Sequence, residues 1–289
     1  MAKSKIQHQL GFSLLALFKH YGTEEQCVKA LFNWKWTTGF ICAECSSQSY
    51  RTLKSRKIHQ CNRCHHQTSL TTNTIFEHSK PPLTIWFLSV HLIVQSKVGI
   101  SALSLKRQIG VSYSTAWRVK QKIMQVMKER DDKRQLSGIV QVDDVYYGGE
   151  CHGGKRGRGS ENKLSFIAAI STKTHLSKGS TVVSDGLACF SAVKDAECEH
   201  FSIVTGGGPE SVTKQQFIWV NTMIRNVKNA ITGTYHSINP RHLSRYLAEY
   251  CYRFNRRCSL EDMLPRFMYV ALRTPPMPQK YLSIAELYG

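Results

Sequence analysis

Apolar residues recur with helical spacing between residues 79 and 132 of this 289-residue chain. The continuous apolar run Leu83–Val94 predicts a buried helix, because it is well short of the length that crosses a bilayer. Two shorter apolar stripes follow, separated by Gly110, and Ser112 can cap the second of the two helices that they predict. The stripes consist of Ala102, Leu105 and Ile109, and of Ala116, Val119, Ile123 and Val126. A short turn between two amphipathic helices predicts a helix-turn-helix.

After residue 138 the pattern changes to β-branched runs that alternate with helices. Strands are predicted over residues 139–145, 164–171, 181–185 and 201–205. A helix over residues 214–231 is predicted to bury the stripe Phe217, Val220, Ile224, Val227 and Ile231. A last helix, which begins at Asn239-Pro240, is predicted to bury an apolar face and to leave its arginines in solvent. Its buried set is Leu243, Leu247, Tyr250, Cys251 and Phe254, and its arginines are Arg241, Arg245, Arg253 and Arg256.

The net charge of the chain limits the classes of molecule that it is expected to bind. A net charge of +19 and a pI near 9.6 indicate that the protein binds a polyanionic partner. Nucleic acid fits best, because the basic residues recur along the whole chain. No apolar run is long enough for a membrane span, and no secretory signal is recognisable at the start. Ten cysteines without such a signal predict a protein of the reducing cytoplasm, where thiols bind metal or stay free.

Four cysteines have the spacing of a zinc site. Cys42 and Cys45 form one C-x-x-C pair, and Cys61 and Cys64 form a second. Two such knuckles can close a tetrahedral site of four thiolates, so we expect one structural zinc; the alternative is four unrelated free thiols. The stretch 50–60 between the pairs is basic and predicts a hairpin that contacts phosphate.

Two further segments are candidates for DNA contact. In a helix-turn-helix the start of the second helix enters the major groove, which points to Tyr113, Ser114, Thr115 and Arg118 as base or phosphate contacts. An ordinary helical hairpin is the alternative. The glycine-rich loop between the first two strands lacks a P-loop signature and is interpreted as a DNA-contacting hairpin tip, with the basic residues Lys155, Arg156 and Arg158.

Two aspartates and an asparagine form the candidate catalytic set. Asp143 and Asp185 each lie at or near the end of a predicted strand, and Asn221 lies on a helix with Lys228 two turns later on the same face. Oxygen ligands of this kind suit a pair of magnesium ions acting on phosphodiesters. The alternative is that the aspartates only terminate strands, which is common for this residue type.

Several motifs, in this order, resemble bacterial insertion-sequence transposases of the DDE superfamily, in the subgroup with an N-terminal zinc ribbon that is related to the eukaryotic Merlin elements. The motifs are Val142-Asp143-Asp144-x-Tyr146-x-Gly148-Gly149, Lys155-Arg156-Gly157-Arg158-Gly159, Ser184-Asp185-Gly186, Asn221 with Lys228, Gly233-Thr234-Tyr235-His236, and Tyr252-x-Phe254-Asn255-Arg256-Arg257. The resemblance extends from about Phe32 to Arg257.

The resemblance implies an α/β catalytic domain with the ribonuclease H-like fold. It assigns magnesium binding to Asp143, Asp185 and Asn221, and contact with DNA near the scissile phosphate to Lys228. Asn221 supplies a neutral oxygen where Glu would carry charge, so weaker binding of the second ion is expected. Relatives carry another strand and a helix before the Asp185 strand, where this chain has only the short stretch 172–180. An internal deletion of one strand and one helix is therefore expected.

These inferences give a multidomain chain: a zinc ribbon region over 20–78, a helix-turn-helix DNA-binding domain over 79–132, and a ribonuclease H-like domain over 138–289. The leading function is a DNA transposase that cleaves and joins element ends, working as a homo-oligomer on terminal repeats and target DNA in the bacterial nucleoid. One alternative is an internally deleted copy that only binds DNA. Another is a zinc-ribbon DNA-binding regulator, in which Asp143 and Asp185 would have no function.

Overall fold

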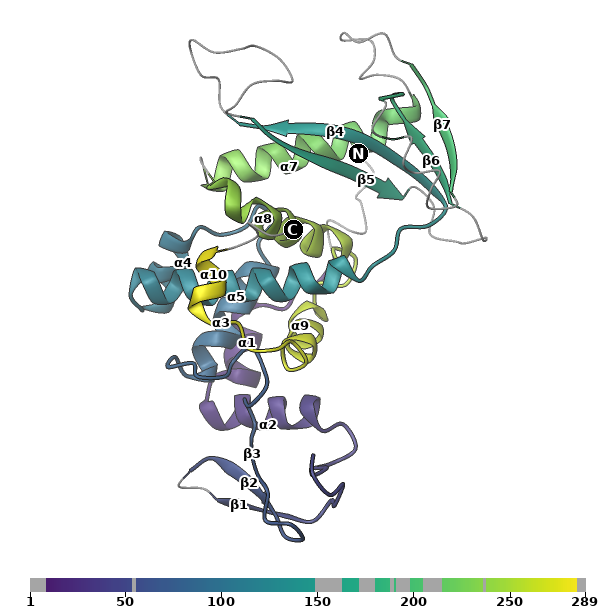
Figure 1. Ribbon diagram of the computed structural model, residues 1–289. Helices are drawn as coiled ribbons and strands as arrows, with labels where there is room; N and C mark the ends of the chain where they lie inside the picture. The colour runs from purple at the N-terminus through teal and green to yellow at the C-terminus, as the bar shows by residue number, and fades with distance from the viewer. Residues whose placement is uncertain are drawn as a thin grey trace. The chain divides into compact units, whose positions relative to one another are not determined.

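A computed structural model describes residues 9–53, 56–148, 163–171, 180–187, 190, 198–204, 215–235 and 238–284. The chain divides into two compact units, whose elements are labelled in Figure 1. The first unit combines residues 1–133 with residues 241–289, and the second consists of residues 134–240.

The first unit begins with two helices and a small sheet. Helix α1 spans Leu14–Tyr21 and α2 spans Glu24–Lys35, where Thr23 and Gln26 form a reciprocal capping box at the start of α2. The sheet is antiparallel, in the order β1, β2, β3, with bounds Tyr50–Leu53, Ile58–Cys61 and Gln67–Ser69. The predicted basic hairpin is therefore present as β1 and β2.

The helical core of this unit follows the predicted apolar pattern. Helix α3 spans Leu83–Val94, as predicted, and most of its residues are buried. Helices α4, Ala102–Ile109, and α5, Tyr113–Asp132, are joined by a turn in which Gly110 has a φ of 69°, a conformation that favours glycine. The whole predicted stripe of α5, from Ala116 to Val126, is buried in the core. The predicted buried helix and the two helices joined by a short turn are therefore present, which fits both a helix-turn-helix and an ordinary helical hairpin.

Three helices from the C-terminal segment complete the first unit: α8, Leu243–Asn255, preceded by a short 3-10 turn at Pro240–His242; α9, Met263–Ala271; and α10, Gln279–Ile284. Helix α8 packs along α5, while α9 packs against α2, α3 and α5. The boundary therefore differs from the predicted domain 138–289, because residues 241–289 group with the N-terminal helices.

The prediction of a solvated arginine face on α8 is wrong for two of its four arginines. Arg245 is 3 % exposed and Arg253 is 7 % exposed, whereas Cys251, which was predicted to be buried, is exposed. Arg245 donates to the side-chain oxygen of Gln125 on α5 at 2.8 Å and to the backbone oxygen of Leu282 on α10 at 2.9 Å. These hydrogen bonds turn the polar face of α8 inward, because α5 and α10 supply partners that an isolated helix lacks.

The second unit contains a four-stranded sheet in the order β5, β4, β6, β7. The strands are β4, Ile139–Tyr147; β5, Leu164–Ser171; β6, Thr181–Ser184; and β7, Glu199–Ser202. Strand β5 is antiparallel to β4, while β6 is parallel to β4 and β7 is parallel to β6. A mixed α/β unit therefore follows the zinc ribbon and the helices, as predicted.

Helix α7, Ile218–Tyr235, lies along one face of this sheet and packs against β4 and β5 (Figure 1). A 3-10 turn, Gln215–Phe217, precedes it. The predicted buried stripe is present at Phe217, Val220, Val227 and Ile231, while Ile224 is half-buried. No helix among the described residues combines the length and the apolar composition that a membrane span needs.

Candidate functional site

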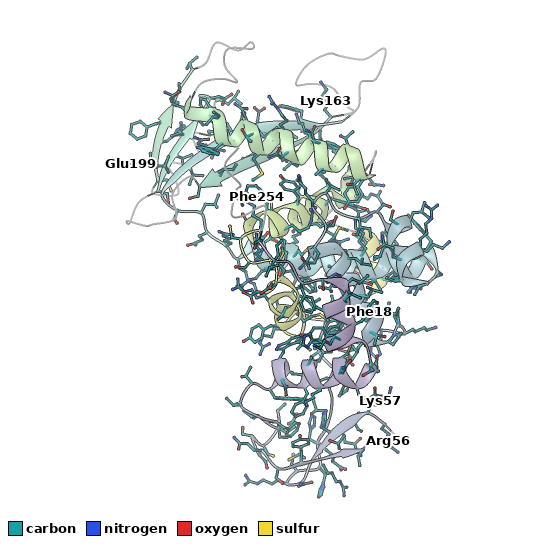
Figure 2. All side chains as sticks on the ribbon, turned by 180° about the vertical axis from the view of Figure 1, so that it is seen from behind. Phe18, Arg56, Lys57, Lys163, Glu199 and Phe254 are labelled. Atoms are coloured by element: carbon teal, nitrogen blue, oxygen red, sulfur yellow. The ribbon has the colours of Figure 1, made fainter. Side chains whose placement is uncertain are left out.

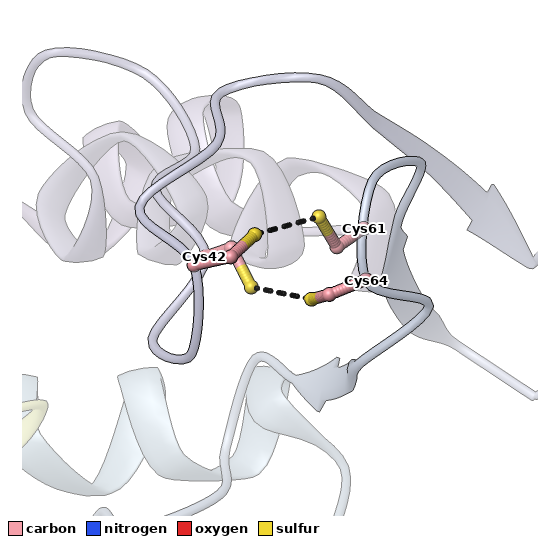
Figure 3. Close-up of side chains that lie close together, drawn as sticks. Cys42, Cys61 and Cys64 are labelled. Atoms are coloured by element: carbon pink, nitrogen blue, oxygen red, sulfur yellow. Dashed lines mark hydrogen bonds between the residues drawn. The ribbon is translucent and has the colours of Figure 1, made fainter.

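The four predicted zinc ligands come together in the small sheet of the first unit. The sulfur of Cys42 lies 3.5 Å from that of Cys64, and the sulfur of Cys45 lies 3.5 Å from that of Cys61 (Figure 3). All four sulfurs lie within 4.8 Å of one another. Four sulfurs bound to one zinc at about 2.3 Å would lie roughly 3.8 Å apart in a tetrahedron, so the cluster has the size of a structural zinc site.

The backbone around Cys61 favours the thiolate form that zinc needs, whereas, against an amide hydrogen bond from His66, burial and the neighbouring cysteine sulfurs raise the pKa of Cys64 to about 12. Amide hydrogen bonds, first from Cys64 and then from Arg63, lower the pKa of Cys61 to about 6 against the opposing effect of burial. The amide of Arg63 donates to the Cys61 sulfur at 3.4 Å. The residues present therefore fit a structural zinc ion.

The charged surface of the ribbon lies on the β1–β2 hairpin. Arg56 and Lys57 are exposed there, and Figure 2 shows both next to the hairpin. Arg51 instead donates from Nη2 to the side-chain oxygen of Gln60 at 2.9 Å, across the two strands. The hairpin thus presents two exposed cations and one guanidinium that is hydrogen-bonded across the strands, a set that can contact phosphate without reading bases.

The predicted DNA-contacting residues of α5 gather at its first turns. Ser112 caps the helix by accepting a hydrogen bond from the amide of Thr115 at 3.3 Å. Tyr113 and Ser114 are exposed, Tyr113 by 52 %, while Thr115 and Arg118 are half-buried. This end of α5 carries exposed residues, whereas the middle of the helix is buried between α4 and α8.

Arg118 already has protein partners. Its Nε donates to the backbone oxygen of Ser114 at 3.2 Å, and its Nη1 donates to the side-chain oxygen of Gln279 on α10 at 3.1 Å. These contacts fix the guanidinium near the start of α5. The predicted loop residues Lys155, Arg156 and Arg158 lie outside the described residues.

The sheet of the second unit brings the two predicted catalytic aspartates side by side. Gln141 on β4 pairs with Val183 on β6, and Asp143 and Asp185 each lie two residues further along these parallel strands. Neighbouring strands are about 4.8 Å apart, so the two carboxylates start from adjacent positions. Asp185 also accepts a hydrogen bond from the amide of Leu187 at 3.2 Å, which fixes the turn after β6.

Asp144 joins this pair. Oxygens of Asp143, Asp144 and Asp185 all lie within 4.8 Å of one another, and all three residues are half-buried. The sequence analysis quoted Asp144 within a motif but gave it no role; its position directly after Asp143 on the same strand was the available signal. Three carboxylates at this spacing suit a hard divalent cation, which would also relieve their mutual repulsion.

Asn221 and Lys228 lie on α7, both half-buried at the edge of its buried stripe, as predicted. The residue before Asn221 is tied to the sheet, because the amide of Val220 donates to the side-chain oxygen of Gln141 at 3.1 Å. Helix α7 therefore starts over the strand that carries Asp143.

Two family models match the regions that contain these sites. A transposase zinc-ribbon domain matches residues 22–67, which include all four cysteines, and an ISXO2-like transposase domain matches residues 170–255, which include Asp185, Asn221 and Lys228. Both models describe IS1595 transposases. Two separate regions of the chain are thus similar to domains of IS1595-family transposases. Asp143 and Asp144 lie before the second match, so neither family model covers them.

One relative of the chain is described as an uncharacterized protein in transposable element ISH50 of Halobacterium salinarum. It is 27 % identical over 148 residues, which cover 50 % of this chain and 49 % of the relative. The matched part thus spans about half the length of that protein. No solved structure matches the chain.

Proposed function

We propose that this chain is a DNA transposase that cuts and joins the ends of its own insertion sequence, with a catalytic unit of the ribonuclease H-like type. The observation that carries the proposal is the cluster of Asp143, Asp144 and Asp185, whose oxygens lie within 4.8 Å of one another on adjacent strands. The sheet order supports it, because an antiparallel strand flanks β4 on one side and two parallel strands follow on the other.

The catalytic set of the proposal is Asp143 and Asp185 with Asn221, and Asp144 adds a third carboxylate. When bound, a pair of magnesium ions would activate the attacking oxygen and stabilise the leaving one. The carboxylates hold the cations, Asn221 offers a neutral oxygen from α7, and Lys228 contacts the DNA near the scissile phosphate. Because Asn221 adds no charge, the contribution of Asp144 to cation affinity is expected to be large.

DNA recognition is assigned to the first unit. The exposed start of α5, with Tyr113, Ser114, Thr115 and Arg118, would read the terminal repeat, and the hairpin cations would neutralise phosphate. The loop residues Lys155, Arg156 and Arg158 remain candidate DNA contacts. Two element ends must be processed together, which calls for at least two copies of the chain on the DNA.

A catalytically impaired copy is the second candidate function. On the proposed fold, the chain between β5 and β6 is too short for the strand and the helix that complete the sheet in relatives. Strand β5 supports this view, since Ile167 on its outer face is 65 % exposed. A bare apolar side chain of this kind is expected where a covering element has been lost.

The test is a strand-transfer assay with the purified chain, magnesium, and DNA that carries the flanking repeats of the element. Asp143→Asn is expected to abolish cleavage and to keep repeat binding, because it removes ligand charge and almost no volume. Asp262→Asn, an exposed carboxylate of the first unit, is the matched control and should retain activity.

Each outcome of the assay favours one reading. Magnesium-dependent cleavage that survives Asp143→Asn would refute the catalytic assignment. Selective repeat binding without any cleavage would identify the impaired copy. In that case, insertion of a family-like strand and helix between Ser171 and Thr181 should raise thermal stability and restore cleavage together.

A further inference from the structure

Gln141 is a buried polar residue in the middle of the catalytic sheet that none of the assigned roles uses. It lies on β4, between β5 and β6, and is 6 % exposed. An uncharged amide at the centre of a sheet is costly to bury unless its polar atoms find partners. Its side-chain oxygen accepts the hydrogen bond from the amide of Val220 at 3.1 Å, so the residue joins the sheet to α7.

The location of this hydrogen bond on α7 is specific. Val220 lies in the first turn of the helix, where backbone amides depend on partners outside the regular helical ladder. Val220 itself is fully buried, and Phe217 before it is also buried, so this turn packs closely against the sheet. The next residue is Asn221. Gln141 therefore fixes the turn of α7 that carries the third member of the candidate catalytic set.

Its location on β4 is equally specific. Side chains alternate between the two faces of a strand, so Gln141 and Asp143 project from the same face, the face against which α7 starts. Gln141 thus lies two residues before the candidate ligand Asp143 on β4. Its hydrogen bond reaches Val220, which directly precedes the candidate ligand Asn221. A helix shift of about an ångström at this turn would move Asn221 out of ligand geometry, because catalytic groups need to be held to about half an ångström.

We propose that Gln141 is a positioning residue, whose side-chain oxygen holds the first turn of α7 against β4 and so sets Asn221 relative to Asp143 and Asp185. The inference rests on the proposed function, because it takes Asn221 as a cation ligand. A purely stabilising role predicts something different: the loss of Gln141 would loosen the sheet as a whole and would affect cation binding whether or not Asn221 is present.

A double-mutant cycle on cation affinity separates these roles without any need for catalysis. The zinc-loaded full chain is titrated with Mn²⁺, and free Mn²⁺ is followed by electron paramagnetic resonance. Asn221→Ala and Gln141→Met are each expected to weaken Mn²⁺ binding, Gln141→Met by about tenfold, which is the usual effect of losing a group that orients a ligand. In the Asn221→Ala background, Gln141→Met should have no further effect, because residues that act through one another are not additive.

A matched control is available in the other unit. Gln121 is fully buried on α5, and its side-chain oxygen accepts a hydrogen bond from Arg245 at 3.4 Å. Gln121→Met removes the same chemical group from a core and should leave Mn²⁺ affinity unchanged. Hydrogen exchange at the Val220 amide should become faster in Gln141→Met. If that variant does not fold, Gln141→Asn, which withdraws the acceptor by one carbon, takes its place in the cycle.

Three results would overturn the inference, and they are distinguishable. If Asn221→Ala weakens Mn²⁺ binding while Gln141→Met does not, the inference fails and the proposed function stands. If the two changes are additive, Gln141 acts on the sheet as a whole and not through Asn221. If the wild-type chain binds no Mn²⁺, or if Asn221→Ala has no effect, the proposed ligand set is wrong and the inference falls with it.

Discussion

Glu249 is the residue whose removal should most damage the first unit. It is fully buried on α8, and its Oε2 lies 3.3 Å from the Nζ of Lys120 on α5. Its Oε1 lies 3.6 Å from the Nη2 of Arg253, one turn further along α8. Lys120 also lies over the ring of Tyr246, with Nζ 4.6 Å from the centroid. One carboxylate therefore neutralises two buried cations.

Glu249→Ala would remove the carboxylate that pairs with both cations. Breaking a buried ion pair in this way typically costs about 3–5 kcal/mol in the free energy of unfolding. Burial lowers the pKa of Lys120, an effect that Glu249 opposes, so without Glu249 the lysine can release its proton. Arg253 cannot, but it keeps hydrogen bonds to the backbone oxygens of Ser96 and Lys97. We therefore expect a loss near the lower limit, about 3 kcal/mol.

Thermal unfolding followed by calorimetry measures this loss. For a unit of this size the expected fall in the midpoint is roughly 6–12 °C, since each kcal/mol is worth about 2–4 °C. Glu261→Ala, at an exposed carboxylate of the same segment, should leave the midpoint unchanged. Lys120→Met should cost less than Glu249→Ala, because Glu249 keeps Arg253 as a partner. A fall below 2 °C for Glu249→Ala would refute the reasoning.

Four further outcomes are expected. Cys61→Ser should lower the zinc content, measured by elemental analysis, from about one ion per chain and should lower helicity, because the ribbon folds around its metal. Zinc should be retained at pH 7 and lost on acidification, since protons compete with the ion for the four thiolates; zinc release at pH 7 would contradict this. Arg118→Ala should weaken repeat binding and reduce its sequence preference in a salt-dependent shift assay, whereas Gln279→Ala, which only frees the guanidinium, should preserve both. Ile167→Thr should reduce aggregation in light scattering without lowering the melting midpoint, because the side chain is exposed.

Local patterns were enough to predict the elements that carry the sites. The bounds of the helix Leu83–Val94 and of the strand Leu164–Ser171 follow from apolar runs that end at polar or turn residues. The zinc cluster follows from cysteine spacing, because a knuckle is a local structure. The adjacency of Asp143 and Asp185 follows from two parallel strands that pair in register. Each of these features depends on residues close in sequence or on one strand pairing.

Features that depend on distant partners could not be predicted in the same way. Arg245 and Arg253 are indistinguishable in sequence from solvated arginines. The burial of Arg245 is explained by its hydrogen bond to Gln125 on α5. The burial of Arg253 is explained by Glu249 and by the backbone of the loop between α3 and α4. The grouping of residues 241–289 with the N-terminal helices follows from the same contacts. The role assigned to Gln141 needs the start of α7 to be placed over β4, a relation that no sequence period encodes.

The two-part construction of the first unit also affects how the protein is made. Lys120 emerges from the ribosome long before Glu249, and the whole second unit is synthesised in between. Until α8 arrives, α5 carries a lysine that will later be buried and an apolar stripe with one of its covering helices missing. Contacts across such a long stretch of chain form slowly, because the loop between them must close first. A nascent chain that has finished the carboxylate cluster therefore still lacks helix α8, so the core of the first unit can be completed only after α8 has left the ribosome.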